Sequence, residues 1–295
     1  MTMIFGVPLA VFMGQLMLGL INGAFYALLS LGLAVIFGLL KIVNFAHGAQ
    51  YMLGAFAALL GFRYLGINYW VALLLVPLVV GGLGMVIERV ILRRIAHLDH
   101  LYGLLLTFGL ALIAEGTLVN LFGVSGSSYP TPEALQGGIN LGFMFLPIYR
   151  AWVLVAALVV CLGTWFIIER TRLGAYLRAG TENPALMQAF GVNVPLLVTL
   201  TYGFGVALAA FAGVLAAPLY PVSPTMGSSL LIVVFAVVVI GGMGSILGAI
   251  ITGLSMGLIE GLTKVYYPEA ANTVIFLVMI LVLMLRPAGL FGKEA

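Results

Sequence analysis

The chain has 295 residues, of which 63% are hydrophobic and only 7% are charged. A soluble domain of this length would carry roughly a quarter of charged residues, so the composition excludes a soluble globular protein and indicates an all-α protein with many membrane spans. The formal net charge of +3 requires no nucleic-acid partner, because membrane proteins gather basic residues in a few loops. The single cysteine, Cys161, excludes an intrachain disulfide and, in its apolar run, is expected to be a small packing residue.

The first apolar run, Gly6–Leu40, is followed by a polar segment at residues 44–50 (Asn-Phe-Ala-His-Gly-Ala-Gln). A span needs about 20 apolar residues, so this run fits one long tilted span or two short ones. Polar side chains at membrane depth are costly unless they face protein or a water-filled path. Transporters often place their substrate path at such a break, so the segment points to function.

The rest of the chain contains five further apolar runs with the length of a single helix: Trp70–Ile91, Leu101–Phe122, Ile148–Ile168, Leu196–Ala217 and the shorter Thr273–Leu285. The run Ser229–Leu262 is too short for two comfortable spans with a loop, and residues 241–245 (Gly-Gly-Met-Gly-Ser) interrupt it. We therefore expect two short or tilted helices joined inside the membrane, since glycine permits a positive φ. The total is about eight to ten spans in a single transmembrane domain over residues 1–295.

Basic residues predict which loops face the cytoplasm. They lie around the 92–100 loop, in the 169–195 loop and near the carboxyl terminus: Arg89, Arg93, Arg94, Arg170, Arg172, Arg178, Arg286 and Lys293. By the positive-inside rule, these three regions are cytoplasmic. The 123–147 loop carries one charge, Glu133, and the 218–228 loop carries none, so both are expected on the other side.

Short similarities predict a weak internal repeat, with halves at roughly 1–140 and 170–295. Leu53-Gly54-Ala55 follows the first break, and Leu247-Gly248-Ala249 follows the second. If the repeat is real, both breaks line one central pathway. Glycines at four-residue spacing also predict close packing of helix backbones. These are Gly19, Gly23, Gly244, Gly248, Gly253, Gly257 and Gly261.

The 169–195 loop specifies a short helix of about two turns. Asn183 is a suitable N-cap, Pro184 suits the first helical position, and Gly191 suits the stop. Glu182 lies beside the positive end of the helix dipole. A helix this short is not stable alone, so its apolar stripe must pack on its own bundle or on another protein. The stripe consists of Leu186, Met187 and Phe190.

Four stretches of the chain resemble the permease subunits of ABC importers of the branched-chain amino acid type (LivH-like). They are residues 22–28 (Asn-Gly-Ala-Phe-Tyr-Ala-Leu), 43–48 (Val-Asn-Phe-Ala-His-Gly), 174–191 and 239–245 (Val-Ile-Gly-Gly-Met-Gly-Ser). The Asn-Phe-Ala-His-Gly and Gly-Gly-Met-Gly-Ser signatures are specific for this family, and the stretches follow one another over nearly the whole chain. The resemblance implies a multi-pass permease of a bacterial-type inner (plasma) membrane.

The resemblance also implies partners. A second, related permease would form a heterodimer with this chain, two cytoplasmic ABC ATPases would drive it, and an extracytoplasmic solute-binding protein would deliver the solute. The chain itself would need no cofactor, because its partners use the ATP. The loop would be the coupling element that enters a groove on the ATPase, through Arg178, Glu182, Asn183, Leu186, Met187, Phe190 and Gly191.

Asn44 and His47 are the first candidates for lining the pathway, and a hydrogen-bonded structural role at a helix break is the alternative. A proton relay through His47 is not favoured, because no acidic residue lies nearby in the sequence. Gln15 is a further candidate for the same interior. The full candidate set for the pathway is Asn22, Asn44, His47, Gly48, Gln50, Gly241, Gly242, Gly244 and Ser245.

Other polar residues receive a structural interpretation. Glu115 and Glu260 lie within apolar runs, where interhelical bonding or snorkelling is favoured over substrate binding. His97 and His100 have no further clustered ligands, so no metal site is expected.

Three classes of function compete. An importer permease is favoured, and since the chain has no Gly-x-x-x-x-Gly-Lys-Ser/Thr loop, a partner must hydrolyse the ATP. A self-contained channel or ion-coupled transporter would need paired charges in its spans, and these are scarce. An intramembrane enzyme would need a Ser/His pair, a carboxylate pair or a metal cluster, and His47 has no obvious nucleophile or acid partner in the sequence.

The substrate class stays broad. Many family members carry an acidic residue after the His-Gly pair, where this chain has Ala49. Related permeases carry branched-chain amino acids, urea, short amides or aromatic acids. We therefore expect a branched-chain amino acid or a related small polar solute, without assigning leucine.

Overall fold

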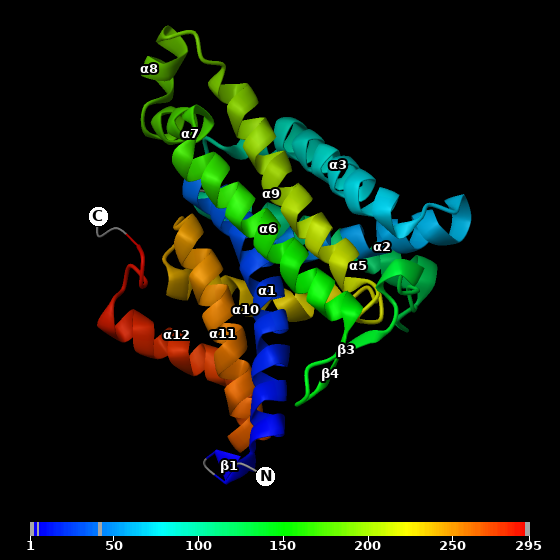
Figure 1. The fold of residues 1–295 in the computed structure, drawn as a ribbon. Helices are drawn as coiled ribbons and strands as arrows, with labels where there is room; N and C mark the ends of the chain where they lie inside the picture. The colour runs from blue at the N-terminus through cyan, green and yellow to red at the C-terminus, as the bar shows by residue number, and fades with distance from the viewer. Residues whose placement is uncertain (1–2, 5, 41–42, 293–295) are drawn as a thin grey trace. The chain divides into compact units, whose positions relative to one another are not determined.

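The computed structural model describes residues 3–4, 6–40 and 43–292, and it is mostly helical (Figure 1). In this described part, six helices are long and apolar enough to cross a membrane, and the apolar helices α10 (Met226–Gly241) and α12 (Val274–Leu285) are shorter. The predicted helical membrane bundle is confirmed. The described part thus has six candidate spans and two shorter apolar helices, against the eight to ten spans predicted.

The helices match the predicted runs closely: α3 (Tyr69–Ile87), α5 (His100–Phe122), α6 (Ile148–Arg170), α9 (Val194–Ala216) and α12. The first apolar run forms one continuous helix, α1 (Leu9–Leu40). Of the two predicted alternatives, one long span or two short ones, the structure has the long one. The 229–262 run forms α10 and α11 (Ile246–Tyr266), which confirms the predicted break between two helices.

The chain divides into two compact units. Unit 1 comprises residues 1–30, 130–161 and 233–295, and unit 2 comprises residues 31–129 and 162–232. Helices α1, α6 and α10 each contribute residues to both units. These divisions do not follow the two halves of the predicted repeat, which stays a prediction.

Unit 1 is built on α1, α10, α11 and α12. Buried side chains of the last three helices form its core: Ala236, Val237, Ile240, Met256, Ile275 and Val282. A Cβ on Gly23 would meet the backbone of Leu254, and one on Gly257 would meet Gly23. The predicted close packing at the glycines of α1 and α11 is thus confirmed.

Short elements complete unit 1. The strands β1 (Met3–Ile4) and β2 (Val7–Pro8) form one antiparallel pair. The strands β3 (Gly138–Asn140) and β4 (Phe145–Pro147) form another, with Ile139 opposite Leu146. Two 3-10 turns, η2 (Glu133–Leu135) and η3 (Pro268–Ala270), lie in the connections.

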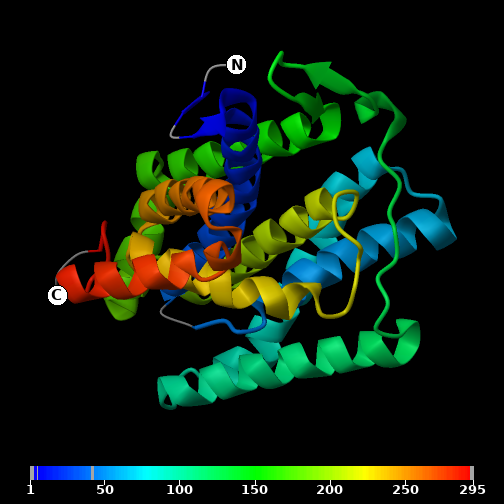
Figure 2. The same ribbon diagram turned by 90° about the horizontal axis from the view of Figure 1, so that it is seen from below.

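Unit 2 is centred on α9, which packs against both α2 (His47–Leu65) and α3. Helix α5 contacts α2 and keeps most of its surface exposed, and Figure 2 shows it as the blue-green helix at the outside of this unit. Helix α3 continues into a π-helical turn, η1 (Glu88–Leu92), and then α4 (Arg93–Ile95). The 169–195 loop contains two helices, α7 (Arg172–Glu182) and α8 (Pro184–Ala189), of which the sequence predicted only the second.

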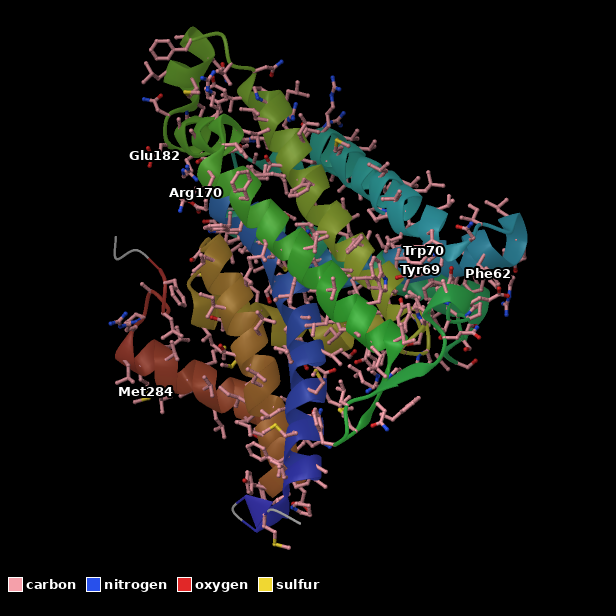
Figure 3. All side chains as sticks on the ribbon, viewed as in Figure 1. Phe62, Tyr69, Trp70, Arg170, Glu182 and Met284 are labelled. Carbon is pink, nitrogen blue, oxygen red and sulfur yellow. The ribbon has the colours of Figure 1, made fainter. Side chains whose placement is uncertain are left out.

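The two ends of unit 2 differ in chemistry. Figure 3 shows Arg170 and Glu182 at the end that carries α7 and α8, and Phe62, Tyr69 and Trp70 together at the other end. The Phe62 ring lies 5.4 Å from that of Tyr129, which follows α5 in the 123–147 loop. Burial raises the pKa of the Tyr129 phenol to about 12. Because Tyr and Trp are enriched at membrane–water interfaces, the aromatic cluster indicates that this end of unit 2 lies near one of them.

Candidate functional site

The polar break before α2 is a buried hydrogen-bonded network. Asn44 is 1% exposed, and its side-chain amide donates to Gln50 Oε1 at 3.0 Å. Its carbonyl oxygen accepts from the backbone N–H of Ala46 at 3.1 Å, which satisfies a donor at the start of α2. Gln50 in turn donates from Nε2 to the hydroxyl of Tyr202 on α9 at 3.4 Å. The network therefore joins the break to the central helix of unit 2.

His47 opens α2 and is also 1% exposed. It lies against Gly32 of α1, where a Cβ would come 2.9 Å from the imidazole Cε1. Gly48, beside it, faces the backbone of Gly227 in the first turn of α10. Unit 2 thus brings together four of the candidate pathway residues: Asn44, His47, Gly48 and Gln50.

The second break, between α10 and α11, lies in unit 1. Gly242 and Gly244 adopt φ of 97° and 91°, a region that L side chains rarely adopt, which explains why glycine suits this turn. Ser245 caps α11 by accepting from Gly248 N at 3.0 Å. Gly241 still belongs to α10, so the break is residues 242–245. Asn22, the remaining candidate, is half-buried on α1 of the same unit.

The segment after α12 closes this break by backbone hydrogen bonds. Leu290 N donates to Ile240 O at 2.8 Å, and Phe291 N donates to Gly241 O at 3.1 Å. The last carbonyls of α10 have no partner in their own helix, so these donors act as an external cap.

Helix α8, the predicted docking helix, begins and ends with the residues that the sequence predicted. Asn183 Oδ1 accepts from Leu186 N at 3.0 Å, Pro184 is the first helical residue, and Gly191 has φ of 81°. Leu186 is 52% exposed and Phe190, just past the helix end, is 76% exposed, whereas Met187 is half-buried. The apolar stripe is therefore only partly covered by its own chain.

The two charged residues predicted for this element lie on α7. The Arg178 guanidinium donates to Ile168 O at 3.0 Å and lies 3.5 Å from the carboxylate of Glu169. These contacts fix α7 on the end of α6. Glu182 is exposed in the last turn of α7, directly before the Asn183 cap.

An ion pair between the partly exposed Arg93 and the buried Glu88 lies next to this element and was not predicted. Glu88, with 3% of its side chain exposed, accepts two hydrogen bonds from Arg93, from Nε at 3.2 Å and from Nη2 at 3.0 Å. Thr199 of α9 donates to Glu88 Oε2 at 2.7 Å, and Arg93 also donates to Pro195 O at 2.9 Å. Residues five apart do not face each other on an α-helix, so only the π-helical turn η1 makes the pair possible.

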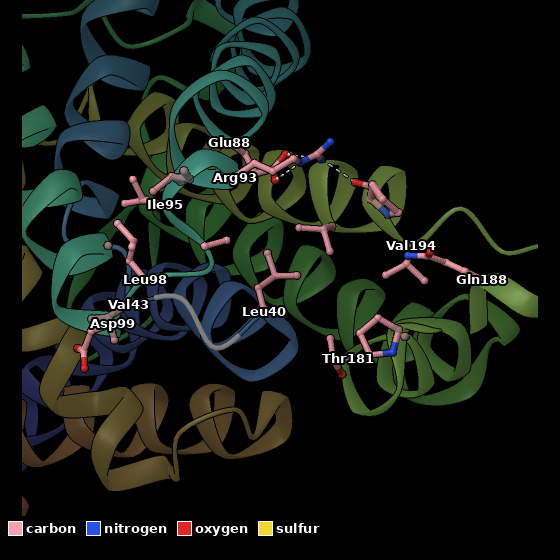
Figure 4. A pocket seen from close by; sticks show the side chains of 17 residues that line it. Leu40, Val43, Glu88, Arg93, Ile95, Leu98, Asp99, Thr181, Gln188 and Val194 are labelled. Atoms are coloured by element: carbon pink, nitrogen blue, oxygen red, sulfur yellow. Dashed lines mark hydrogen bonds and ion pairs between the residues drawn. The ribbon is translucent and has the colours of Figure 1, made fainter. Parts of the chain in front are cut away.

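A cavity of about 400 Å³ borders the ion pair. Figure 4 shows Glu88 and Arg93 on one side of it and Gln188 and Val194 on another. Its walls come from the turn η1, from α7 and α8, from the first residues of α9, and from Leu40, Val43 and residues 95–103. The cavity thus separates α8 from the end of α3.

Glu260 of α11 has the interhelical bonding that the sequence predicted. It is 5% exposed and accepts from Tyr26 OH of α1 at 2.6 Å, and it pairs with Lys264 one turn later. Its charge is therefore matched within unit 1.

These features define a multi-pass helical membrane protein with interrupted helices and an exposed, capped helix at one end. The model of the family described as "Branched-chain amino acid transport system / permease component" matches residues 15–284. The chain belongs to this family. It is a permease component of an ABC transport system, a non-catalytic transport subunit, and such a subunit carries no cofactor.

Relatives match over most of their length. The chain is 30% identical over 300 residues to the high-affinity branched-chain amino acid transport system permease protein BraD of Pseudomonas aeruginosa, covering 96% of both chains. It is 29% identical to LivH of Escherichia coli K12, again over 96% of both. It is also 28% identical to LivM of the same organism, over 90% of this chain and 67% of LivM. No solved structure matches the chain.

Proposed function

We propose that this chain is one half of the membrane pore of an ABC importer, and that α7 and α8 form its contact with a cytoplasmic ATPase. A second, related permease forms the other half, two ATPases supply the energy, and an extracytoplasmic binding protein delivers the solute. The similarity to both LivH and LivM, two permeases of one organism, supports a heterodimer. Because these relatives are named for branched-chain amino acids, such amino acids or a related small solute are the proposed substrate.

The exposure of α8 supports the docking role more than any other observation. A six-residue helix is not stable by itself, yet Asn183 and Gly191 define both of its ends. Leu186 and Phe190 expose apolar surface beside it. Covering such surface with a partner is favourable, at about 25 cal/mol per Å².

The test is a pull-down of the tagged chain from its native membrane in mild detergent, read by mass spectrometry. The test variant is Phe190→Asp, and Val124→Asp is the matched control, because Val124 is 72% exposed in the loop predicted to lie on the opposite side. We expect the unaltered chain and the control to recover ATPases and a second permease, and Phe190→Asp to lose the ATPases. Recovery of the chain alone, from membranes that transport without ATP, would instead support a channel or secondary transporter.

We further propose that the two helix breaks are the moving parts of the pathway. In unit 2 the candidates are Asn44, His47, Gly48 and Gln50, and in unit 1 they are Asn22, Gly241, Gly242, Gly244 and Ser245. The polar groups of the first break are buried and hydrogen-bonded, which is compatible with a closed gate whose bonds exchange when it opens. Reduced uptake by Gln50→Leu with ATPase binding unchanged would support this role, and unchanged uptake would contradict it.

A further inference from the structure

Helix α9 connects the docking element, α7 and α8, to the polar break before α2. Its first residues follow α8 directly, with Asn193 Oδ1 capping the helix at Leu196 N, and α7 and α8 both pack against it. Farther along the same helix, Tyr202 receives the hydrogen bond from Gln50. Because the helix is rigid, a displacement of its first residues by α7 and α8 can be transmitted to the Tyr202–Gln50 contact.

The Glu88–Arg93 pair joins this helix to the end of α3. Thr199 donates to Glu88 and receives a hydrogen bond from Arg93, and Arg93 also bonds Pro195 O. Both contacts fall on the first turns of α9, between the docking element and Tyr202. These bonds fasten the first turns of α9, which border the cavity, to the end of α3, whereas the rest of α9 already packs along α3.

We propose that Glu88, Arg93 and Thr199 form a latch that holds the first turns of α9 against the end of α3, so that displacement of α8 by the ATPase moves α9 as one body and reaches Gln50 through Tyr202. These are positioning residues, because they act on the break through α9. The inference rests on the proposed function, since it requires an ATPase at α8. When the latch is lost, we expect the importer to assemble but to transport less solute for each ATP hydrolysed.

The π-helical turn supports this assignment. A carboxylate with 3% of its side chain exposed is costly unless its hydrogen bonds are complete, and η1 aims Arg93 at Glu88. Such turns are often found at functional sites. A pair needed only to hold α3 straight would not require the two additional bonds from Arg93 to α9.

The test uses the assembled importer in proteoliposomes with its binding protein, with leucine as the probe solute. Thr199→Val removes the hydroxyl but leaves the Glu88–Arg93 ion pair intact. Thr201→Val is the matched control, because Thr201 is also buried on α9 and has no hydrogen bond from its side chain among the described residues. We expect Thr199→Val to lower the leucine transported per ATP hydrolysed roughly three- to tenfold, and Thr201→Val to leave this ratio unchanged.

The second variant, Tyr202→Phe, removes the other end of the route. If both contacts serve one route, the double variant will be little worse than the poorer single variant. Equal ratios for Thr199→Val, Thr201→Val and the unaltered importer would overturn the latch.

A measurement that does not depend on the solute distinguishes failure of the latch from failure of the proposed function. In the assembled complex, hydrogen exchange at residues 44–50 should change when a non-hydrolysable ATP analogue binds, and Thr199→Val should abolish that change. If Thr199→Val leaves the change intact, the latch is wrong although the importer assembles. If the chain assembles with no ATPase, the proposed function itself fails.

Discussion

Gly48 stands in the first turn of α2, where its backbone touches that of Gly227 on α10. The contact is reciprocal, because a Cβ on either glycine would meet the backbone carbonyl of the other. Backbone atoms cannot move aside as a flexible side chain can. Only glycine fits at position 48, because any side chain would meet the backbone of Gly227. This position lies beside the buried Asn44–Gln50 hydrogen bond.

Gly48→Ala is expected to destabilise the protein by about 1–3 kcal/mol, because the added methyl group overpacks this contact. Gly116→Ala on α5 is the matched control, since its Cβ would meet nothing within 4 Å. Removing a mid-helix glycine there should stabilise by about 0.5–1 kcal/mol. Thermal unfolding of the purified chain in detergent measures both, and equal shifts in the two variants would show that the contact with Gly227 is not tight.

At the scale of elements, α8 depends on its caps. The Asn183 side chain accepts a hydrogen bond from its first turn, and Gly191 ends it in a left-handed conformation. With six residues, the helix gains little from its own hydrogen bonds. Its conformation before docking is thus set by residues at its two ends.

Asn183→Ala should weaken α8 by about 1 kcal/mol, whereas Asn183→Ser retains a capping oxygen and should cost less. Because α8 is peripheral to the packed helices, global thermal stability should hardly change in either variant. The binding of the ATPase should fall in Asn183→Ala, by about tenfold at most, because part of the docking energy is then used to order the helix. Titration of the purified ATPase against the chain in nanodiscs measures this. Identical affinities for the two variants would argue against a preformed α8.

At the scale of the whole molecule, the basic loops predict a single orientation in the membrane. This orientation places α8 in the cytoplasm and the 123–147 loop outside. The chain offers a clean background for a test, because Cys161 is its only cysteine and is buried in α6.

In a Cys161→Ser background, Leu186→Cys and Val124→Cys should react with a membrane-impermeant maleimide from opposite sides. Leu186 is 52% exposed and Val124 is 72% exposed, so both positions are accessible on their own side. Intact cells should label only Val124→Cys, and inverted vesicles only Leu186→Cys. Labelling of both from one side would contradict the predicted topology and the docking role of α8.

The sequence by itself determined the class of protein, the positions of the long helices, a break within residues 241–245 and the caps of α8. Each of these depends on hydropathy or on chemistry within a few neighbouring residues, which the linear order contains. The separate helix α7 was missed, since its polar residues show no long apolar run.

Only the tertiary structure decided which distant side chains meet. Glu88 and Thr199 are 111 residues apart and Gln50 and Tyr202 are 152 apart, so no local pattern indicates either pair. Even Glu88 and Arg93, five apart, required a π-helical turn that their spacing does not predict. The exposure of Leu186 and Phe190 was also open in the sequence, because an apolar stripe fits its own bundle as well as a partner. Hydropathy selects the helices, but the packing of α2, α3 and α9 selects the contacts between them.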